Sequence, residues 1–207
     1  MKNVFPLLKA NWDLSIRLNL LLAIAYLLFV PIIRGIANLD AVHSAECLEQ
    51  AVAFIGVFLF VPLTGPEQSK DVQEVVFSKK KSYVTVLLMR LVIAICSLIV
   101  LILIFASAMT LLSCSFPFYK YVFGTLASAL VLGSCGFLTS ALSNSMIAGY
   151  LTSAGYFMLN ILGGIETSSK LSLFSMSDGI FDVKYWLMAI GCLCILSVVL
   201  YEKLHKR

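Results

Sequence analysis

The sequence has few charged residues for its length. Asp, Glu, Lys and Arg make up 13% of its 207 residues, whereas 60% are hydrophobic and the mean hydropathy is +0.98. A typical soluble domain carries about 25% charged residues. This shortage excludes an ordinary soluble protein and indicates a polytopic membrane protein.

Histidine and intramembrane acids are also scarce, which excludes several kinds of catalysis. The two histidines, His43 and His205, lie outside the spans, so Ser134 has no base with which to form an intramembrane Ser–His protease. No pair of acids lies mid-membrane for a proton relay, and the chain has no Walker-type phosphate loop. We therefore expect no enzyme activity and no catalytic or cofactor-binding residue in this chain.

The six cysteines form no metal-binding motif. Cys192 and Cys194 are two residues apart, so they point to different faces of a helix and cannot make a compact metal site. Cys47 and Cys114 are expected near the outer surface, where a disulfide and two free thiols are both open and free thiols are favoured. No metal ligand is predicted.

Long uncharged runs dominate the rest of the sequence. A membrane-spanning helix needs about 17–25 mostly apolar residues, and the runs are 18–33, 50–66, 91–119, 121–165 and 185–201. Run 121–165 is long enough for two crossings, and the polar stretch 143–145 supplies the break. The sequence thus predicts a single all-α transmembrane domain over 1–207, with six helices centred near residues 26, 57, 101, 131, 155 and 193.

The Lys and Arg residues of the loops orient these spans. With six spans both termini share one side, and that side holds eleven basic residues against four on the other, Arg34, Lys120, Lys170 and Lys184. We therefore expect a multi-pass protein of the bacterial plasma membrane with both termini in the cytoplasm. The formal charge of +4 reflects this topology and does not indicate nucleic-acid binding.

Residues 1–17 predict an amphipathic helix that lies along the membrane surface. Lys9, Asp13 and Arg17 follow one another at i, i+4 spacing on its polar stripe. The opposite stripe is apolar with an aromatic anchor and consists of Val4, Phe5, Leu8, Trp12 and Ile16. This periodicity favours an interfacial helix over a frayed start of the first span.

The segment 65–82 is a conspicuously polar stretch between two apolar runs. Pro66 can begin a short helix, whose positive N-terminus suits Glu67 and Asp71. The apolar face of this helix, at i, i+3, i+4 spacing, is Val72, Val75 and Val76. Such a helix is too short to be stable alone in water, so its apolar face needs a partner, either the inner ends of its own bundle or another protein.

Small residues recur in the fourth and fifth spans. They form rows spaced four or eight apart, which are Gly124, Ser128, Gly136 and Ser140, then Thr125, Ala129 and Gly133, then Ser145, Gly149 and Ser153. Such rows let helix backbones approach closely. They favour, in this order, packing within the bundle, a dimer interface and a seam that slides.

Charged residues near the ends of the runs are expected in polar surroundings. Arg90 lies close to the cytoplasmic end of the third span, about 83–112, and is expected to snorkel to lipid phosphates. The outer loop 34–49 is short and mildly acidic and offers no candidate chemistry. The stretch 166–184 is unusually apolar for an outer loop, so we expect an extracellular re-entrant segment of short helices buried against the bundle.

Together these features resemble the membrane subunits of type-2 ABC exporters (ABC-2 permeases, with the type V exporter fold). Residues 1–17 look like the elbow helix of that family. Residues 65–82 look like its cytoplasmic coupling loop, with an acidic start at Glu67, a Glu-aliphatic-aliphatic helix at 74–76 and a serine and basic exit at 78–79. The turn at 143–145 is similar to the second cytoplasmic loop, and 166–184 sits where the family places re-entrant helices. The lysines at 79–81 depart from the Pro-containing exit that is more usual.

The resemblance implies a mechanism and partners. Two such subunits, identical or paralogous, pair in the membrane with two separate ATPase subunits, which hold ATP and Mg²⁺. The residues implied at the ATPase interface are Glu67, Asp71, Val72, Glu74, Val75, Val76 and Lys79. Those implied in the elbow helix are Phe5, Leu8, Lys9, Trp12 and Arg17, and those in the packing or dimer seam are Gly124, Ser128, Gly133, Gly136 and Gly149.

The implied function is ATP-driven export of an amphipathic or hydrophobic substrate, such as an antimicrobial peptide. Two other classes stay open from the residues alone. One is the substrate-binding membrane component of a vitamin or metal uptake system, which would gather polar residues toward its outer side. The other is a structural membrane protein with no transport role.

Overall fold

The computed structural model describes residues 16–68, 83–166 and 169–205, and every regular element in these ranges is a helix. The elements are α2 (Arg17–Arg34), α3 (Ala41–Glu46), the π-helical η2 (Cys47–Ala51), the 3₁₀-helical η3 (Val52–Phe54), α4 (Ile55–Phe60), the 3₁₀-helical η4 (Val61–Gln68), α6 (Tyr83–Leu111), α7 (Phe118–Ser143), α8 (Met146–Ile161) and α9 (Asp182–His205). The predicted all-α class is confirmed for this part of the chain.

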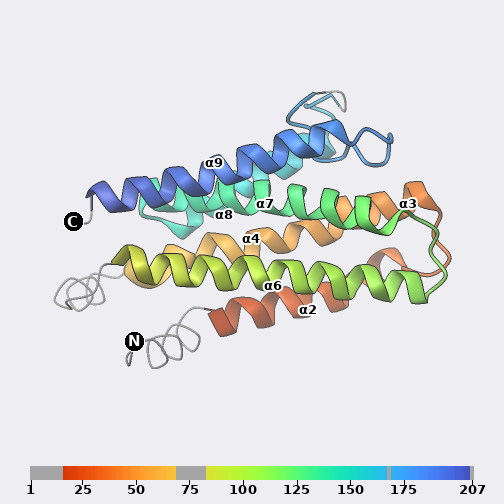
Figure 1. Ribbon diagram of the computed structural model, residues 1–207, viewed down its shortest axis with the longest axis horizontal. Helices are drawn as coiled ribbons and strands as arrows, with labels where there is room; N and C mark the ends of the chain where they lie inside the picture. Colours follow the sequence, from red (N-terminus) through yellow and green to blue (C-terminus); the bar gives the residue numbers. More distant parts are fainter. Residues whose placement is uncertain (1–15, 69–82, 167–168, 206–207) are drawn as a thin grey trace.

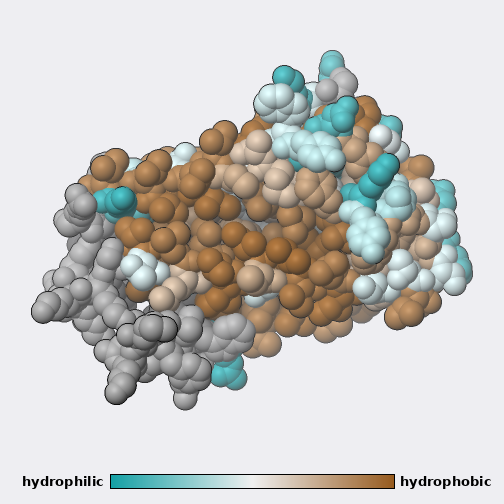
Figure 2. Space-filling model, in the orientation of Figure 1, coloured by the Kyte–Doolittle hydropathy of each residue, from teal (hydrophilic) through white to brown (hydrophobic). Residues whose placement is uncertain are grey.

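Five helical stretches are long and apolar enough to cross a membrane. They are Arg17–Arg34, Ala41–Gly65, Val84–Leu111, Phe118–Ser143 and Asp182–Leu204. The face shown in Figure 2 is correspondingly apolar over the middle of the molecule, with most of the visible polar residues at the right and a few at the left. The chain is thus an integral membrane protein. Helix α8 has 16 residues, or roughly 24 Å at 1.5 Å per residue, and is not among the five.

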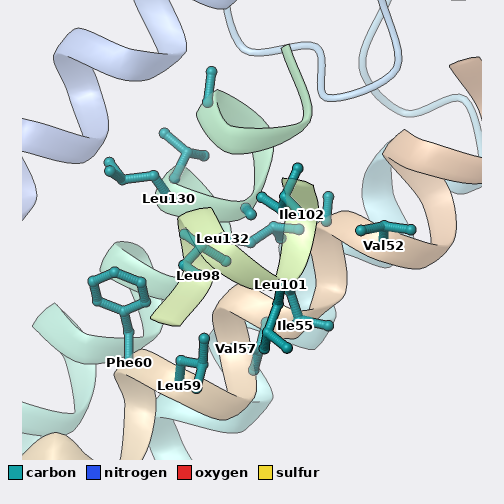
Figure 3. Packing of buried hydrophobic residues seen from close by; sticks show 14 of the residues in the cluster. Val52, Ile55, Val57, Leu59, Phe60, Leu98, Leu101, Ile102, Leu130 and Leu132 are labelled. Carbon is teal, nitrogen blue, oxygen red and sulfur yellow. The ribbon is translucent and has the colours of Figure 1, made fainter. Parts of the chain in front are cut away.

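The helices run side by side along the long axis of the molecule (Figure 1). The start of α2 and the end of α9 both lie toward the same end of the long axis, called here the terminal end. The opposite end, the loop end, holds the connections 35–40 and 112–117 and the start of α9. Helix α7 is central and packs against α4, α8 and α9. In the core, Phe60, Ile102 and Leu132 from three different helices are fully buried (Figure 3).

The break predicted between the fourth and fifth spans is present. Helix α7 ends at Ser143, and Asn144 adopts a left-handed conformation with φ of 51°. Its backbone N–H donates to the carbonyl of Ser140, and α8 begins two residues later. Asparagine tolerates this conformation better than most residues, so the turn can reverse the chain without glycine.

The second span begins earlier than predicted, and the expectation of an outer loop over 34–49 was wrong. The Asp40 side chain accepts a hydrogen bond from the backbone N–H of His43 at 2.9 Å and caps α3, which leads directly into η2. This bond and one from the His43 ring hold the pKa of the exposed Asp40 carboxyl below its usual value. Only 35–40 remains as the connection, and Glu49 lies inside the helical stretch.

Candidate functional site

Most of the residues predicted to contact an ATPase lie outside the described part of the chain. These are Asp71, Val72, Glu74, Val75, Val76 and Lys79, together with Phe5, Leu8, Lys9 and Trp12 of the predicted elbow helix. Glu67 belongs to η4 and Arg17 begins α2, so both lie at the terminal end (Figure 1). The structure therefore describes the base of the 65–82 segment and not its tip.

Hydrogen bonds tie η4, the helix that leads into this segment and forms its base, to two other helices. The guanidinium of Arg90 in α6 donates to the carbonyl oxygen of Leu63 at 3.1 Å. In a 3₁₀ helix that carbonyl would accept from the residue three positions on, which is Pro66 and has no N–H. The hydroxyls of Thr64 and Ser140, the latter in α7, are 2.9 Å apart. Hydrogen bonds thus attach η4 to both α6 and α7.

The position of Arg90 corrects the expectation that it snorkels to lipid phosphates. Its side chain is only 3% exposed, and at least part of its hydrogen-bonding capacity is used inside the protein. An arginine inside a membrane protein is costly unless it is paired or bonded to backbone carbonyls. The carbonyl left without a donor by Pro66 provides one such partner.

The small residues of α7 pack within the chain's own bundle. A Cβ on Gly133 would lie 2.5 Å from the carbonyl oxygen of Gly56, so α4 and α7 touch backbone to backbone. A Cβ on Gly149 would likewise lie 2.5 Å from the carbonyl oxygen of Gly136, which joins α7 to α8. The Cβ of a residue replacing Gly124 would overlap the sulfur of Met176. These contacts place all of these glycines in intrachain seams.

A buried ion pair lies near the loop end. Glu49 of η2 and Lys184 in the first turn of α9 form a salt bridge, and both side chains are 0% exposed. The Lys184 ammonium also donates to Ser128 Oγ at 2.9 Å and to the carbonyl of Leu173 at 2.5 Å. Because burying an ion costs several kcal/mol, such a pair persists only with added hydrogen bonds of this kind.

The same polar side chains hold the main chain of a connecting segment. The Met176 N–H donates to Glu49 at 2.9 Å, and the Leu173 N–H donates to Asn160 Oδ1 of α8 at 2.8 Å. Non-helical backbone is tolerated at membrane depth where protein groups satisfy its polar atoms. Glu49, Ser128, Asn160 and Lys184 are called the polar cluster from here on.

The re-entrant prediction for 166–184 is only partly met. Residues 172–176 are buried against the bundle, as expected, but the described part of 166–181 forms turns and bends rather than short helices. Its main-chain groups are bonded by side chains of the polar cluster, so helical hydrogen bonds are not needed to bury it.

Sequence reasoning placed Ser128 in a packing seam and Asn160 between helices, but it missed the Glu49–Lys184 pair. Glu49 was assigned to the outer loop 34–49 and Lys184 to the end of the re-entrant segment 166–184, because both border apolar runs. In the predicted six-pass topology these two residues lie at the same end, and their opposite charges were a usable signal for pairing. The π-helical turn that aims Glu49 inward, in contrast, has no signature in the sequence.

A strip of aromatic rings crosses the bundle between α2 and α8. The ring of Tyr26 lies 5.4 Å from that of Phe58, and Phe54 lies 5.1 Å from Phe157. Phe157 in turn lies 5.7 Å from Phe174 of the buried segment. Tyr26, Phe54 and Phe58 are only partly buried, so this apolar strip reaches the surface of the chain.

The described residues offer no place for a metal. They contain no group of three or more His, Cys, Asp or Glu side chains that could hold an ion. Cys47 and Cys114 are both buried free thiols, and Cys114 bonds to the carbonyl of Ile36 at 3.1 Å. No protein-family model, curated protein or solved structure matches the chain.

Proposed function

We propose that the chain is the membrane-spanning permease subunit of an ATP-driven exporter of the ABC-2 type. It pairs with a second permease subunit and with separate ATPase subunits in a bacterial plasma membrane. The observation that carries this proposal is the base of the 65–82 segment. This base, formed by η4, lies toward the same end as the start of α2 and the end of α9 and is hydrogen-bonded to α6 and α7.

The arrangement of the termini supports six crossings. The start of α2 and the end of α9 lie toward the same end of the bundle, which fits an even number of passes (Figure 1). Helix α8 then counts as the sixth, shortened to 16 residues and completed at the loop end by the connection that follows it. With six crossings, the excess of Lys and Arg assigns the terminal end to the cytoplasm, where an ATPase resides.

The hydrogen bonds of η4 provide a route by which movement of the 65–82 segment would reach the membrane helices. A push on the tip of 65–82 acts on η4, and the bonds Arg90–Leu63 and Thr64–Ser140 pass the displacement to α6 and α7. Helix α7 in turn meets α4 and α8 across the glycine seams. Close backbone contact leaves few side chains to absorb a displacement, so a small movement of η4 repacks the whole bundle.

The aromatic strip supports an amphipathic or hydrophobic substrate, such as an antimicrobial peptide. Tyr26, Phe54 and Phe58 are partly buried aromatic side chains, and the surface they share is apolar. Aromatic rings gain free energy by contact with apolar surface and with one another. In a paired transporter this strip would line the path between the two permease subunits.

Co-purification tests the proposal. We expect the full chain, expressed with its genomic neighbours, to retain a separate ATPase in a two-to-two complex. Replacing Val72, Val75 and Val76 with Asp should remove the ATPase, because three charges cannot enter an apolar cleft. The matched control is Gln73→Asp with Ser78→Asp, which adds charge beside the valine face and should leave the complex intact.

The polar cluster favours one alternative, the substrate-binding component of a vitamin or metal uptake system. Its four side chains lie toward the loop end, where such a protein would bind its ligand. They are, however, bonded to one another and to the main chain of Leu173 and Met176. Tight binding of a small ligand by the isolated chain, without an ATPase, would favour this alternative and contradict the exporter.

A further inference from the structure

Five consecutive residues of the connection between α8 and α9 are buried against the bundle near the loop end. Ser172 to Met176, called the plug from here on, have side chains that are all less than one tenth exposed. They form no helix or strand. The plug meets α7 at Gly124, where the Met176 sulfur takes the place of a side chain, and it meets α8 through Phe157.

Polar side chains hold the plug by its main chain. The Leu173 carbonyl accepts from Lys184, the Leu173 N–H donates to Asn160, and the Met176 N–H donates to Glu49. Two of these three bonds use the charged partners of the ion pair. Hydrogen bonds to charged groups are stronger than those between neutral groups, so the Glu49–Lys184 pair is the main attachment.

The closed arrangement leaves buried polar atoms unsatisfied. Glu49 Oε2, Ser175 Oγ and Ser44 Oγ are buried and have no hydrogen-bond partner within the described residues. An unmet buried donor or acceptor costs free energy that water would return. Hydration of Glu49 and Ser175 on opening would therefore offset part of the loss of packing.

The backbone around the plug is suited to movement. Gly163 and Gly179 flank it with φ of +73° and +74°, and neither has any atom within 4 Å of where a Cβ would stand. The helix that carries Glu49 is π-helical at 47–51 and then 3₁₀-helical at 52–54, so its regular α-helical hydrogen bonding is interrupted there. Such interruptions often mark positions where helices bend.

We propose that the plug is a removable closure of the loop end and that the Glu49–Lys184 ion pair is its latch. In the closed state the latch holds Leu173 and Met176 by their main chain. In the open state the plug leaves, water reaches both charged groups, and the interior between α7, α8 and α9 is exposed. This device is independent of the exporter assignment, because it requires no ATPase.

Thiol labelling tests the latch. The reporter is Ser175→Cys in the full chain with its six native cysteines replaced by alanine, purified into lipid nanodiscs so that both faces are accessible. A charged, water-soluble maleimide should label this buried position slowly. Lys184→Met should speed labelling by about tenfold or more, because the plug loses its charged hydrogen bond.

Three controls keep the result interpretable. Lys203→Met removes an exposed lysine near the end of α9, at the terminal end, and should leave the rate unchanged. Ser115→Cys, an exposed reporter, should label at one rate in every background. The double variant Glu49→Gln with Lys184→Met removes both charges, so it folds without an unpaired buried ion and should still label quickly.

The double variant decides the outcome if Lys184→Met alone fails to fold. Fast labelling of Ser175→Cys in the double variant supports the latch. Slow labelling, equal to that of the parent chain, would overturn the proposal, because it would show that the plug stays closed without the ion pair. Slow labelling in a well-folded Lys184→Met variant would overturn it equally.

Discussion

The glycine at position 56 lets the backbones of two helices meet. A Cβ there would overlap the carbonyl oxygen of Ala129 in α7. Backbone cannot move aside as a flexible side chain does, so the two helices would have to separate. The same contact seen from the other side is Gly133 against Gly56. At the scale of single residues, the bundle therefore depends on the absence of side chains.

We expect Gly56→Ala to destabilise the chain by about 1–3 kcal/mol, the usual cost of overpacking a core. Gly155→Ala is the matched control, because that glycine is exposed on α8 with no atom within 4 Å of the added Cβ. The control should be neutral or stabilising by about 0.5–1 kcal/mol through helix propensity. Thermal unfolding midpoints in detergent would compare the two. Equal midpoints would mean that the α4–α7 seam can open without cost.

At the scale of elements, Asn144 sets the backbone conformation of the turn between α7 and α8. Its φ of 51° is strained for a β-branched residue. We expect Asn144→Val to destabilise the hairpin by about 1–2 kcal/mol. Asn144→Gly, which adopts this conformation freely, should be close to neutral. Limited proteolysis at the turn would measure the effect, and equal cleavage of the two variants would contradict it.

Several elements could be predicted from the sequence because their signals are local. Uncharged runs gave the approximate centres of the helices, and the polar stretch at 143–145 gave the break. The start of the second span was missed because Glu49 was assigned to the outer loop 34–49. Its burial depends on Lys184, which is 135 positions away, and no local pattern reports such a partner.

The interior bonds of the candidate site were unpredictable for a related reason. Arg90 satisfies a carbonyl that Pro66 leaves without a donor, and the two positions are in different elements. Charge near the end of an apolar run normally indicates an interfacial position. Packing within the bundle, by contrast, was ranked first among the roles of the small-residue rows from their spacing in the sequence alone. The glycine contacts inside the chain involve residues of those rows.

At the scale of the whole molecule, the proposed six crossings make a testable statement about sidedness. We expect reporters fused to the N-terminus and the C-terminus to lie on the same side of the membrane. Ser115→Cys, which is exposed at the loop end, should be labelled from the opposite side. Impermeant thiol reagents on intact cells and inverted vesicles would measure both. Termini on opposite sides would show that α8 does not cross.

The packing of α2 differs from that of the other spans. Few of its residues are buried, and Leu18, Ile32 and Ile33 are among those that face outward. Lipid or a second subunit must cover this surface in a membrane. An isolated chain in detergent would therefore lose order first in α2, while the α4–α7–α8 seam persists.

The way in which the plug is held has a consequence for how such a protein can diverge. The polar cluster recognises the Leu173 carbonyl and the N–H groups of residues 173 and 176, which almost every amino acid possesses. The identities of residues 172–176 are then constrained by volume and not by chemistry. Homologous chains could therefore replace these residues by others of similar volume and keep the same closure. Their relationship would then remain visible in the three-dimensional structure after it was lost from a sequence alignment.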